Sequence, residues 1–264
     1  AEGLGFTKQA MNITIWGNVL NIVLGIILVK GLFGIKPMGV VGVGIATLTD
    51  RILMMIVMLF FVLKSKHFRP YLTSFTLQHI DKLRSIKILK IGAPVAMQYT
   101  FEVGAFGGAA ILIGTLGAVQ QAAHQVAISL ASMTYMMASG VSAAAAVNAG
   151  NNYGKNDFKQ LRLSAISNYH IMLCLMVLAA LFFIILNEYL PWIYTADPSV
   201  IRIAAQLLII AGFFQLFDGA QVVGLGILRG IGDVNIPTVI TFIAYWIVGL
   251  PCGYYLGIIL NLGV

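Results

Sequence analysis

The chain has 264 residues, of which 59% are hydrophobic and 9% are charged, and its mean hydropathy is +0.93. Soluble domains carry about 25% charged residues, so this composition excludes an ordinary water-soluble fold and indicates a membrane protein. The net charge of +7 does not by itself indicate a nucleic-acid partner, because in a membrane protein basic residues mark one face of the bilayer. Cys174 and Cys252 both lie in apolar runs, which excludes a disulfide framework and a metal-binding cysteine spacing.

The predicted elements are apolar stretches long enough to cross a hydrocarbon core, which takes about 20 helical residues. In chain order they cover residues 10–29, 39–63, 91–116, 121–149, 163–186, 199–227 and 236–260. A lipid-facing strand barrel alternates apolar and polar residues, and these stretches do not. We therefore predict an all-α polytopic membrane protein with about seven transmembrane helices.

Lysine and arginine are unevenly distributed between alternate connections. The connections after the second, fourth and sixth stretches hold eleven of them, whereas the opposite ones hold two, Lys30 and Lys36. The positive-inside rule predicts that segments 64–90, 150–162 and 228–235 face the cytoplasm. In segment 64–90, apolar residues recur every three positions from Leu77 to Ile86, which suits either a helix on an anionic membrane surface or a solvated linker.

Four ionisable side chains fall inside the predicted spans: Asp50, Arg51, Glu102 and Asp218. A charge at bilayer depth is costly, so each requires a partner, water or a function. Glu102 shares a helix face at four-residue spacing with Gln98 and Pro94. Pro94 removes one intrahelical hydrogen bond, which favours a hinge beside this carboxylate.

Asp218 lies mid-span with Gln215 and Gln221 three residues away on either side. The functional interpretation of Asp218 and Glu102 is a cation site, in which oxygens bind Na+ or a desolvated carboxylate accepts a proton. The structural interpretation is that the carboxylates hydrogen-bond to glutamines or to Arg51 and hold helices together. Intramembrane carboxylates favour the functional interpretation.

Asp50 and Arg51 are adjacent, so their side chains leave the helix about 100° apart and each is predicted to pair across helices. The planar guanidinium of Arg51 suits a fixed interhelical clamp. The alternative is that Arg51 partners Glu102 or Asp218 in one transport state.

Aromatic and methionine side chains in the same spans have two interpretations. They form either an adaptable wall for flat aromatic cations or ordinary membrane-core packing. The candidates for such a substrate wall are Met133, Tyr135, Phe214 and Phe217.

Small residues also recur at helical spacing. One run extends from Ser139 to Ala149, and Gly249, Gly253 and Gly257 are four residues apart. Both patterns predict close contacts between helices.

Two glycine pairs, in Gly3-Leu4-Gly5 and Gly230-Ile231-Gly232, each precede an apolar span, which suggests two parallel repeats. The runs from Gly92 to Glu102, from Ala122 to Gly154 and from Phe217 to Gly230 resemble multidrug and toxic compound extrusion (MATE) transporters, the NorM-like branch best. The resemblance implies twelve helices in two lobes. It implies that residues 1–63 are the last two helices of the N-terminal lobe, 64–90 a cytoplasmic inter-lobe linker, and 91–264 a C-terminal lobe lacking its final helix. The missing helices are then partners of this chain.

In NorM-like members, a glutamate in the seventh span and an aspartate in the tenth form the coupling site, and the resemblance carries these roles to Glu102 and Asp218. A tyrosine often precedes that aspartate by one turn, and here this position is Phe214. The choice between Na+ and a proton as the coupling ion therefore stays open. The resemblance implies a cation-coupled antiporter of the bacterial inner membrane that exports amphiphilic, often cationic drugs by alternating access. It implies no cofactor beyond the coupling ion and no partner beyond the lipid bilayer and the drug.

Three other functions compete with this prediction. An intramembrane enzyme is not expected, because the sequence has no His-Glu-x-x-His, Gly-x-Ser-x-Gly or Asp-x-x-x-Asp motif. A flippase for lipids or lipid-linked oligosaccharides is the main alternative, but a pyrophosphate group favours a cationic cavity and the spans offer few arginines. Paired carboxylates beside proline and glycine favour alternating access over the third possibility, a channel or static scaffold.

Overall fold

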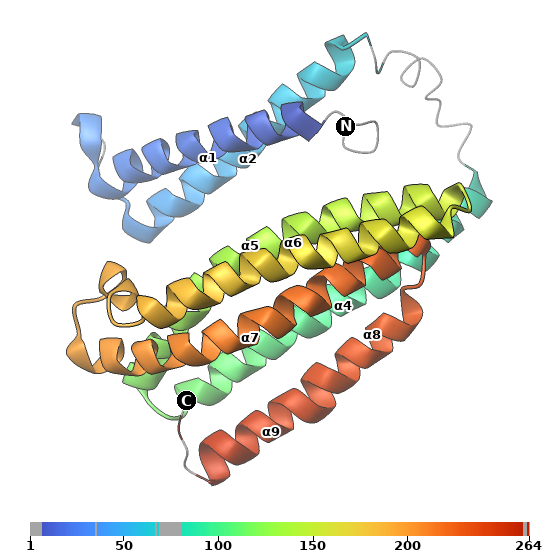
Figure 1. Cartoon of the computed structure of the whole chain (residues 1–264). Coiled ribbons are helices and arrows are strands. Elements are labelled where there is room, and N and C mark those ends of the chain that lie inside the picture. The colour runs from blue at the N-terminus through green and yellow to red at the C-terminus, as the bar shows by residue number, and fades with distance from the viewer. Residues whose placement is uncertain (1–6, 35, 67, 69–80, 261–262, 264) are drawn as a thin grey trace. The chain divides into compact units, whose positions relative to one another are not determined.

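A computed structural model of the chain describes residues 7–34, 36–66, 68, 81–260 and 263 (Figure 1). The chain divides into two compact units, Ala1–Asp81 and Lys82–Val264. Every regular element in the described ranges is a helix, which confirms the predicted all-α class. Each unit is described by itself below.

The first unit is a pair of helices, α1 (Thr7–Lys30) and α2 (Gly39–Lys64), which lie side by side. The short helix η2 (Leu32–Gly34) joins them, with Phe33 and Gly34 in the left-handed region at φ 58° and 80°. At the contact, a Cβ added to Gly42 of α2 lies 3.0 Å from the backbone of Leu28 in α1. The absence of a side chain at Gly42 therefore lets the two backbones approach closely.

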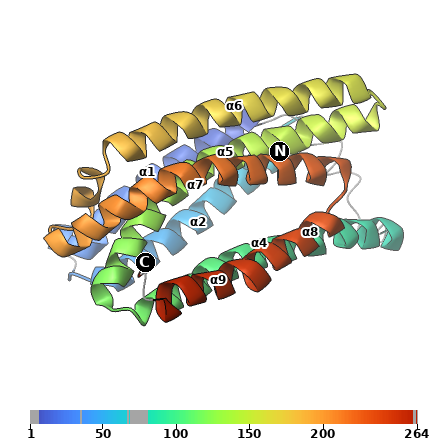
Figure 2. The same ribbon diagram turned by 60° about the horizontal axis from the view of Figure 1, so that its bottom comes forward.

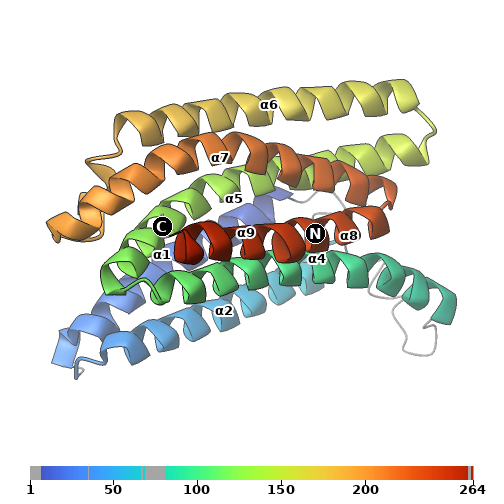
Figure 3. The ribbon, with the colours of Figure 1, turned by 90° about the horizontal axis from the view of Figure 1, so that it is seen from below.

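The second unit contains four long helices and a final helical stretch. The long helices are α4 (Lys82–Gly114), α5 (Ala118–Gly154), α6 (Phe158–Ile185) and α7 (Pro198–Ile231), with the short helix η4 (Leu190–Ile193) before α7. The final stretch runs without a break through α8 (Asn235–Phe242), η5 (Ile243–Gly249), α9 (Leu250–Tyr254) and η6 (Tyr255–Ile259). The elements η5 and η6 are π-helical turns. Helices α5, α6 and α7 pack together, and α4 runs beside α8 and α9 while also contacting α5 (Figures 2 and 3).

Local sequence determines where the long helices begin and end. The side chains of Asp157 and Asp197 accept hydrogen bonds from the backbone N–H groups of Gln160 and Ser199, and so cap α6 and α7. Gly232 ends α7 in the left-handed conformation, at φ 84°. Each cap lies at the polar end of an apolar run, so the caps set the lengths of the membrane segments.

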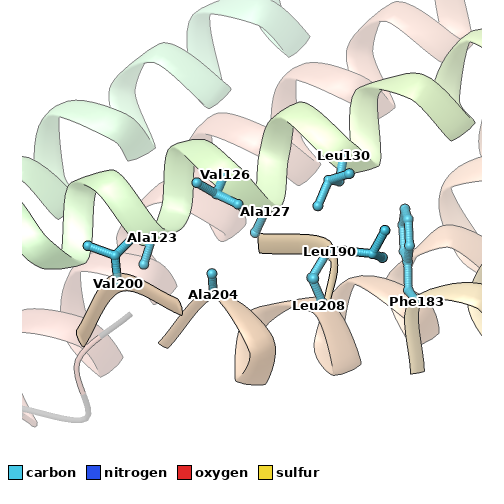
Figure 4. Packing of buried hydrophobic residues seen from close by; sticks show 9 residues of the cluster. All are labelled: Ala123, Val126, Ala127, Leu130, Phe183, Leu190, Val200, Ala204 and Leu208. Carbon is cyan, nitrogen blue, oxygen red and sulfur yellow. The ribbon is translucent and has the colours of Figure 1, made fainter. Parts of the chain in front are cut away.

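Buried apolar side chains join α5, α6, η4 and α7 (Figure 4). The first cluster combines small residues, which allow close approach, with four larger ones that fill the space between them. Its members are Ala123, Val126, Ala127, Leu130, Phe183, Leu190, Val200, Ala204 and Leu208. A second cluster further along the same helices contains Ala138, Ala145, Met172, Met176, Val222 and Val223.

Six helices of the described ranges are long and apolar enough to cross a membrane. The helix α4 is not among them, because its middle carries Gln98, Thr100 and Glu102, but it has 33 residues and overlaps the predicted span 91–116. The four long helices have 28 to 37 residues, or about 40 to 55 Å of helix, against a hydrocarbon core of about 30 Å. The predicted spans are therefore confirmed as helices, and several of these helices are longer than the hydrocarbon core is thick.

Residues 82–90 of the predicted linker form the first turns of α4. Of the three-residue repeat predicted for a surface helix, Leu83 and Ile86 lie in these turns with exposed side chains. Leu77 and Ile80 lie outside the described residues. Attachment of this segment to a membrane surface stays a prediction.

Candidate functional site

The two predicted carboxylates meet across the second unit. Glu102 of α4 and Asp218 of α7 line one pocket of about 260 Å³, and each side chain is 5% exposed. The pocket is otherwise mainly apolar, and its remaining lining comes from α4, α5 and α7: Tyr99, Val103, Phe106, Ile128, Ala131, Ser132, Tyr135, Met136, Phe214 and Gln215. Two buried carboxylates in one apolar pocket form an arrangement suited to exchanging a cation or a proton.

Neither carboxylate has a cationic partner at ion-pair distance among the described residues. The side chain of Tyr135 of α5 lies beside Glu102, and both line this pocket. No described hydrogen bond reaches the Asp218 side chain. When both side chains are ionised, no described cation at ion-pair distance offsets their charge.

Gln215 and Gln221, which flank Asp218 in the sequence, form hydrogen bonds with groups other than the Asp218 carboxylate. Gln215 is fully buried and its Nε2 donates to the backbone oxygen of Ala131 at 3.2 Å, while its Oε1 has no hydrogen-bond partner among the described residues. Gln221 is exposed and its Nε2 donates to the Tyr245 hydroxyl at 3.1 Å. In the described part of the chain these glutamines do not clamp Asp218, so the structural interpretation gains no support from them.

Gln98, one turn before Glu102, is a junction between helices. Its Nε2 donates to the Val234 backbone oxygen at 3.1 Å and to the Thr238 hydroxyl at 2.9 Å, and its Oε1 accepts from Arg229. The Thr238 hydroxyl also lies 3.1 Å from the backbone oxygen of Pro94. The helix α4 continues through Pro94, whose hinge role stays a prediction.

Asp50 and Arg51 lie in the first unit. The Asp50 side chain is 1% exposed, lies against Gly17 of α1, and its Oδ1 has no hydrogen-bond partner among the described residues. Arg51 is exposed. The cross-helix partners predicted for this pair are not found in the described ranges, and the alternative pairing of Arg51 with Glu102 or Asp218 stays a prediction.

The predicted substrate wall divides into two groups. Tyr135 and Phe214 line the pocket of Glu102 and Asp218, as does Met136, a neighbour of the predicted Met133. Met133 and Phe217 do not line it, and their side chains are 60% and 77% exposed.

Sequence reasoning missed Arg229. It was counted as a charge of a cytoplasmic connection, but it lies in the last turn of α7 and its guanidinium bonds to Gln98 and Tyr99 of α4. One signal was available, because Arg229 precedes the helix-ending Gly232 and therefore belongs to the helix. Its partners on a distant segment could not be read from spacing along one helix.

A bundle of helices of membrane-spanning length with buried carboxylates in an interhelical pocket defines a polytopic helical membrane protein. The MatE family profile matches residues 94–255, and the chain belongs to this family. This confirms the resemblance seen in the sequence.

Curated relatives match almost the whole chain. Multidrug resistance protein MdtK of Photorhabdus laumondii is 37% identical over 261 residues, and multidrug resistance protein NorM of Vibrio vulnificus is 38% identical over 258 residues. Each alignment covers 97% of this chain and 56% of the relative, so the chain spans little more than half the length of these proteins.

Solved structures show the same fold. A crystal structure of MATE in the straight conformation superposes with a TM-score of 0.82 at 20% identity, covering 95% of this chain and 55% of that one. A transporter of the MOP superfamily from Pyrococcus furiosus gives 0.78 at 20% identity, covering 94% and 54%. Both likenesses concern the fold alone.

Proposed function

We propose that the chain is part of a cation-coupled efflux antiporter that works by alternating access. The observation that carries the proposal is the single pocket lined by Glu102 of α4 and Asp218 of α7, both buried and without an ion-pair partner among the described residues. Binding of one cation, or of a proton, changes the charge of this pocket by one. Such a change biases a helix bundle between two arrangements.

Oxygen atoms suited to Na+ surround the pocket. Besides the two carboxylates they include the hydroxyls of Tyr135 and Ser132 and the unbonded Oε1 of Gln215. Hard cations prefer oxygen ligands, so Gln215 offers a neutral ligand where Phe214 lacks a hydroxyl. The same carboxylates can also accept a proton, so an experiment must distinguish Na+ from a proton as the coupling ion.

The proposed cargo is an amphiphilic, often cationic drug. The pocket combines negative charge with the aromatic faces of Tyr99, Phe106 and Phe214 and the flexible side chain of Met136. Aromatic faces attract organic cations, and methionine adapts to ligands of different shape. The names of the curated relatives, both multidrug resistance proteins, agree with this cargo.

The proposed location is a bacterial inner membrane, with segments 64–90, 150–162 and 228–235 in the cytoplasm. In the second unit, the start of α4, the α5–α6 turn and the α7–α8 turn all lie at one end of the bundle (Figures 1 and 3). These three places carry Lys82, Lys155 and Arg229, among other basic residues. Their gathering at one end supports the orientation derived from the positive-inside rule.

The test is dye efflux from cells that lack their own efflux pumps, using the complete reading frame that encodes this chain. Ethidium efflux is followed under imposed sodium and proton gradients. We expect efflux to respond to one gradient and to fall to background in Glu102→Gln and Asp218→Asn. Matched controls are Glu188→Gln, in an exposed connection, and Asp197→Asn, which keeps a capping side chain.

The variants must be inserted in the membrane at wild-type amounts for the comparison to count. Cation-driven efflux that persists in both carboxylate variants would contradict the proposal. No efflux from inserted wild-type protein under either gradient would favour the flippase alternative, which is then tested with fluorescent lipids.

A further inference from the structure

Arg229 joins two helices at the basic end of the second unit. Its Nη1 donates to the Tyr99 hydroxyl at 2.8 Å, its Nη2 donates to Gln98 Oε1 at 3.0 Å, and the guanidinium lies 4.7 Å from the centre of the Tyr99 ring. A planar fork that bonds on two sides and stacks on a ring has little freedom to move. The last turn of α7 is therefore fixed to α4.

The contact continues to the next helix. Gln98 is 1% exposed, and its Nε2 bonds to Val234 and Thr238 at the start of α8. Both ends of the Gln98 amide are thus used, one towards α7 and one towards α8. Arg229 and Gln98 together connect three helices.

A second cavity lies directly behind this connection. It has a volume of about 140 Å³, and its lining runs from Arg229 and Tyr99 to Glu102, with the hydroxyls of Tyr135, Ser139 and Ser142 between them. A pocket of this size with several hydroxyls has room for a few water molecules. Along α7, Arg229 is about 16 Å from the level of Asp218, so the cavity extends from the basic end towards the middle of the bundle.

Glu102 lines both cavities, the polar one towards Arg229 and the apolar one shared with Asp218. A group that faces two compartments is placed to exchange a cation between them. The polar compartment offers a hydrated path and the apolar compartment offers the drug site.

We propose that Arg229 closes a water path that runs from the basic end of the bundle to Glu102, and that it is a positioning residue for coupling. The inference rests on the proposed function for its meaning in transport. The fixed guanidinium occupies the end of the path, and its positive charge opposes the entry of a cation from that side. Opening requires the Arg229 bonds to Tyr99 and Gln98 to break, which ties entry of the ion to a movement of α7 against α4.

The first experiment measures access to the cavity without any transport. Ser139→Cys is introduced in the complete protein after Cys174→Ala and Cys252→Ala, and a water-soluble thiol reagent is added to inside-out vesicles. We expect Arg229→Gln to raise the labelling rate about tenfold, because loss of one hydrogen bond to a charged group shifts an open–closed equilibrium by that order. Arg202→Gln, an exposed arginine near the other end of α7, is the matched control and leaves the rate unchanged.

Two milder variants keep the test decisive if Arg229→Gln is poorly folded. Tyr99→Phe removes one acceptor and keeps the ring and the charge, and Arg229→Lys keeps the charge but not the fork. We expect both to label faster than the parent. Unchanged labelling in folded Arg229→Gln, Tyr99→Phe and Arg229→Lys proteins would overturn the proposal.

The second experiment measures cation flux without drug in proteoliposomes. We expect Arg229→Gln to leak the coupling cation and the double variant with Glu102→Gln to return to the wild-type rate, because the path ends at Glu102. A leak that persists in the double variant places the path elsewhere and overturns the inference. If wild-type protein shows no cation-driven efflux, the proposed function fails while the labelling experiment still decides whether Arg229 closes the cavity.

Discussion

Gly226 of α7 lies directly against Ser142 of α5, and a Cβ at Gly226 would collide with both the hydroxyl and the backbone oxygen of Ser142. The Ser142 hydroxyl in turn donates to the backbone oxygen of Val222, one turn earlier in α7, at 2.7 Å. Gly230, one turn later, makes the same kind of close contact with Ala146. The helices that border the Glu102 site are therefore held together by the absence of side chains at two glycines.

Gly226→Ala is expected to destabilise the protein by about 1–3 kcal/mol, because the new methyl group meets backbone that cannot move aside without separating α5 from α7. The measurement is thermal unfolding of the purified protein in detergent. Gly140→Ala in α5 is the matched control, since a Cβ there has nothing within 4 Å and alanine favours the helix. Equal unfolding temperatures for the two variants would show that the contact at Gly226 relaxes without cost.

Gln215→Leu is expected to leave stability nearly unchanged, within about 1 kcal/mol, and to abolish driven efflux. The substitution removes a buried oxygen that has no described partner, and the backbone oxygen of Ala131 keeps a hydrogen bond from Thr134 at 2.8 Å. The same substitution at Gln98, whose amide is bonded at both ends, is the control, and it is expected to cost about 1–3 kcal/mol. Full efflux by Gln215→Leu would exclude Gln215 as a ligand.

Tyr135→Phe keeps the aromatic wall of the pocket and removes the hydroxyl that lies beside Glu102. We expect driven efflux to fall about tenfold, because losing a hydroxyl able to donate to a charged group has that order of effect. Tyr245→Phe is the control, since that hydroxyl bonds to Gln221 rather than to a carboxylate, and it is expected to change efflux by no more than about twofold. Similar losses in both variants would indicate a general packing effect.

The Asp197 carboxylate at the start of α7 is expected to make the stability of the protein depend on pH. Hydrogen bonds from the Ser199 hydroxyl and backbone hold the pKa of the Asp197 carboxyl below its usual range. A lowered folded-state pKa means that this contribution to stability is present above the unfolded pKa of about 3.9 and is lost as the pH falls through the lower folded value. We expect thermal unfolding at pH 7 and pH 3 to differ less in Asp197→Asn than in the wild type, and an equal difference would refute the assignment.

The sequence was sufficient to predict the features that depend only on the position of a residue along one helix. Apolar runs of membrane-spanning length appear as helices, and the carboxylates expected inside them, Glu102 and Asp218, are buried in one pocket. The small residues from Ser139 to Ala149 were expected at a helix contact, and Ser142 and Ala146 lie at one. These features follow from the length, hydropathy and periodicity of single segments.

Other expectations depended on neighbours that one helix does not specify. The glycines at 249, 253 and 257 were expected to mark a close helix contact, but a Cβ at Gly253 meets nothing within 4 Å among the described residues. The nearest atom at Gly249 is a backbone oxygen of its own helical stretch, Ala244. Glycine spacing permits a contact but does not supply the partner that makes one.

Composition and hydropathy by themselves determined that this is a helical membrane protein, and polar residues in apolar spans indicated which side chains are candidates for a functional site. Only the tertiary structure decided which of these residues meet. It turned Gln98 towards Arg229 and α8 rather than towards Glu102, left Gln215 Oε1 without a described partner, and placed both Gln215 and Tyr135 in the lining of the carboxylate pocket. The physical reason is that an ionisable residue inside an apolar span can be recognised from the local sequence, because burying its charge is costly. The partner that offsets this cost comes from another helix, whose rotation and register are set by packing.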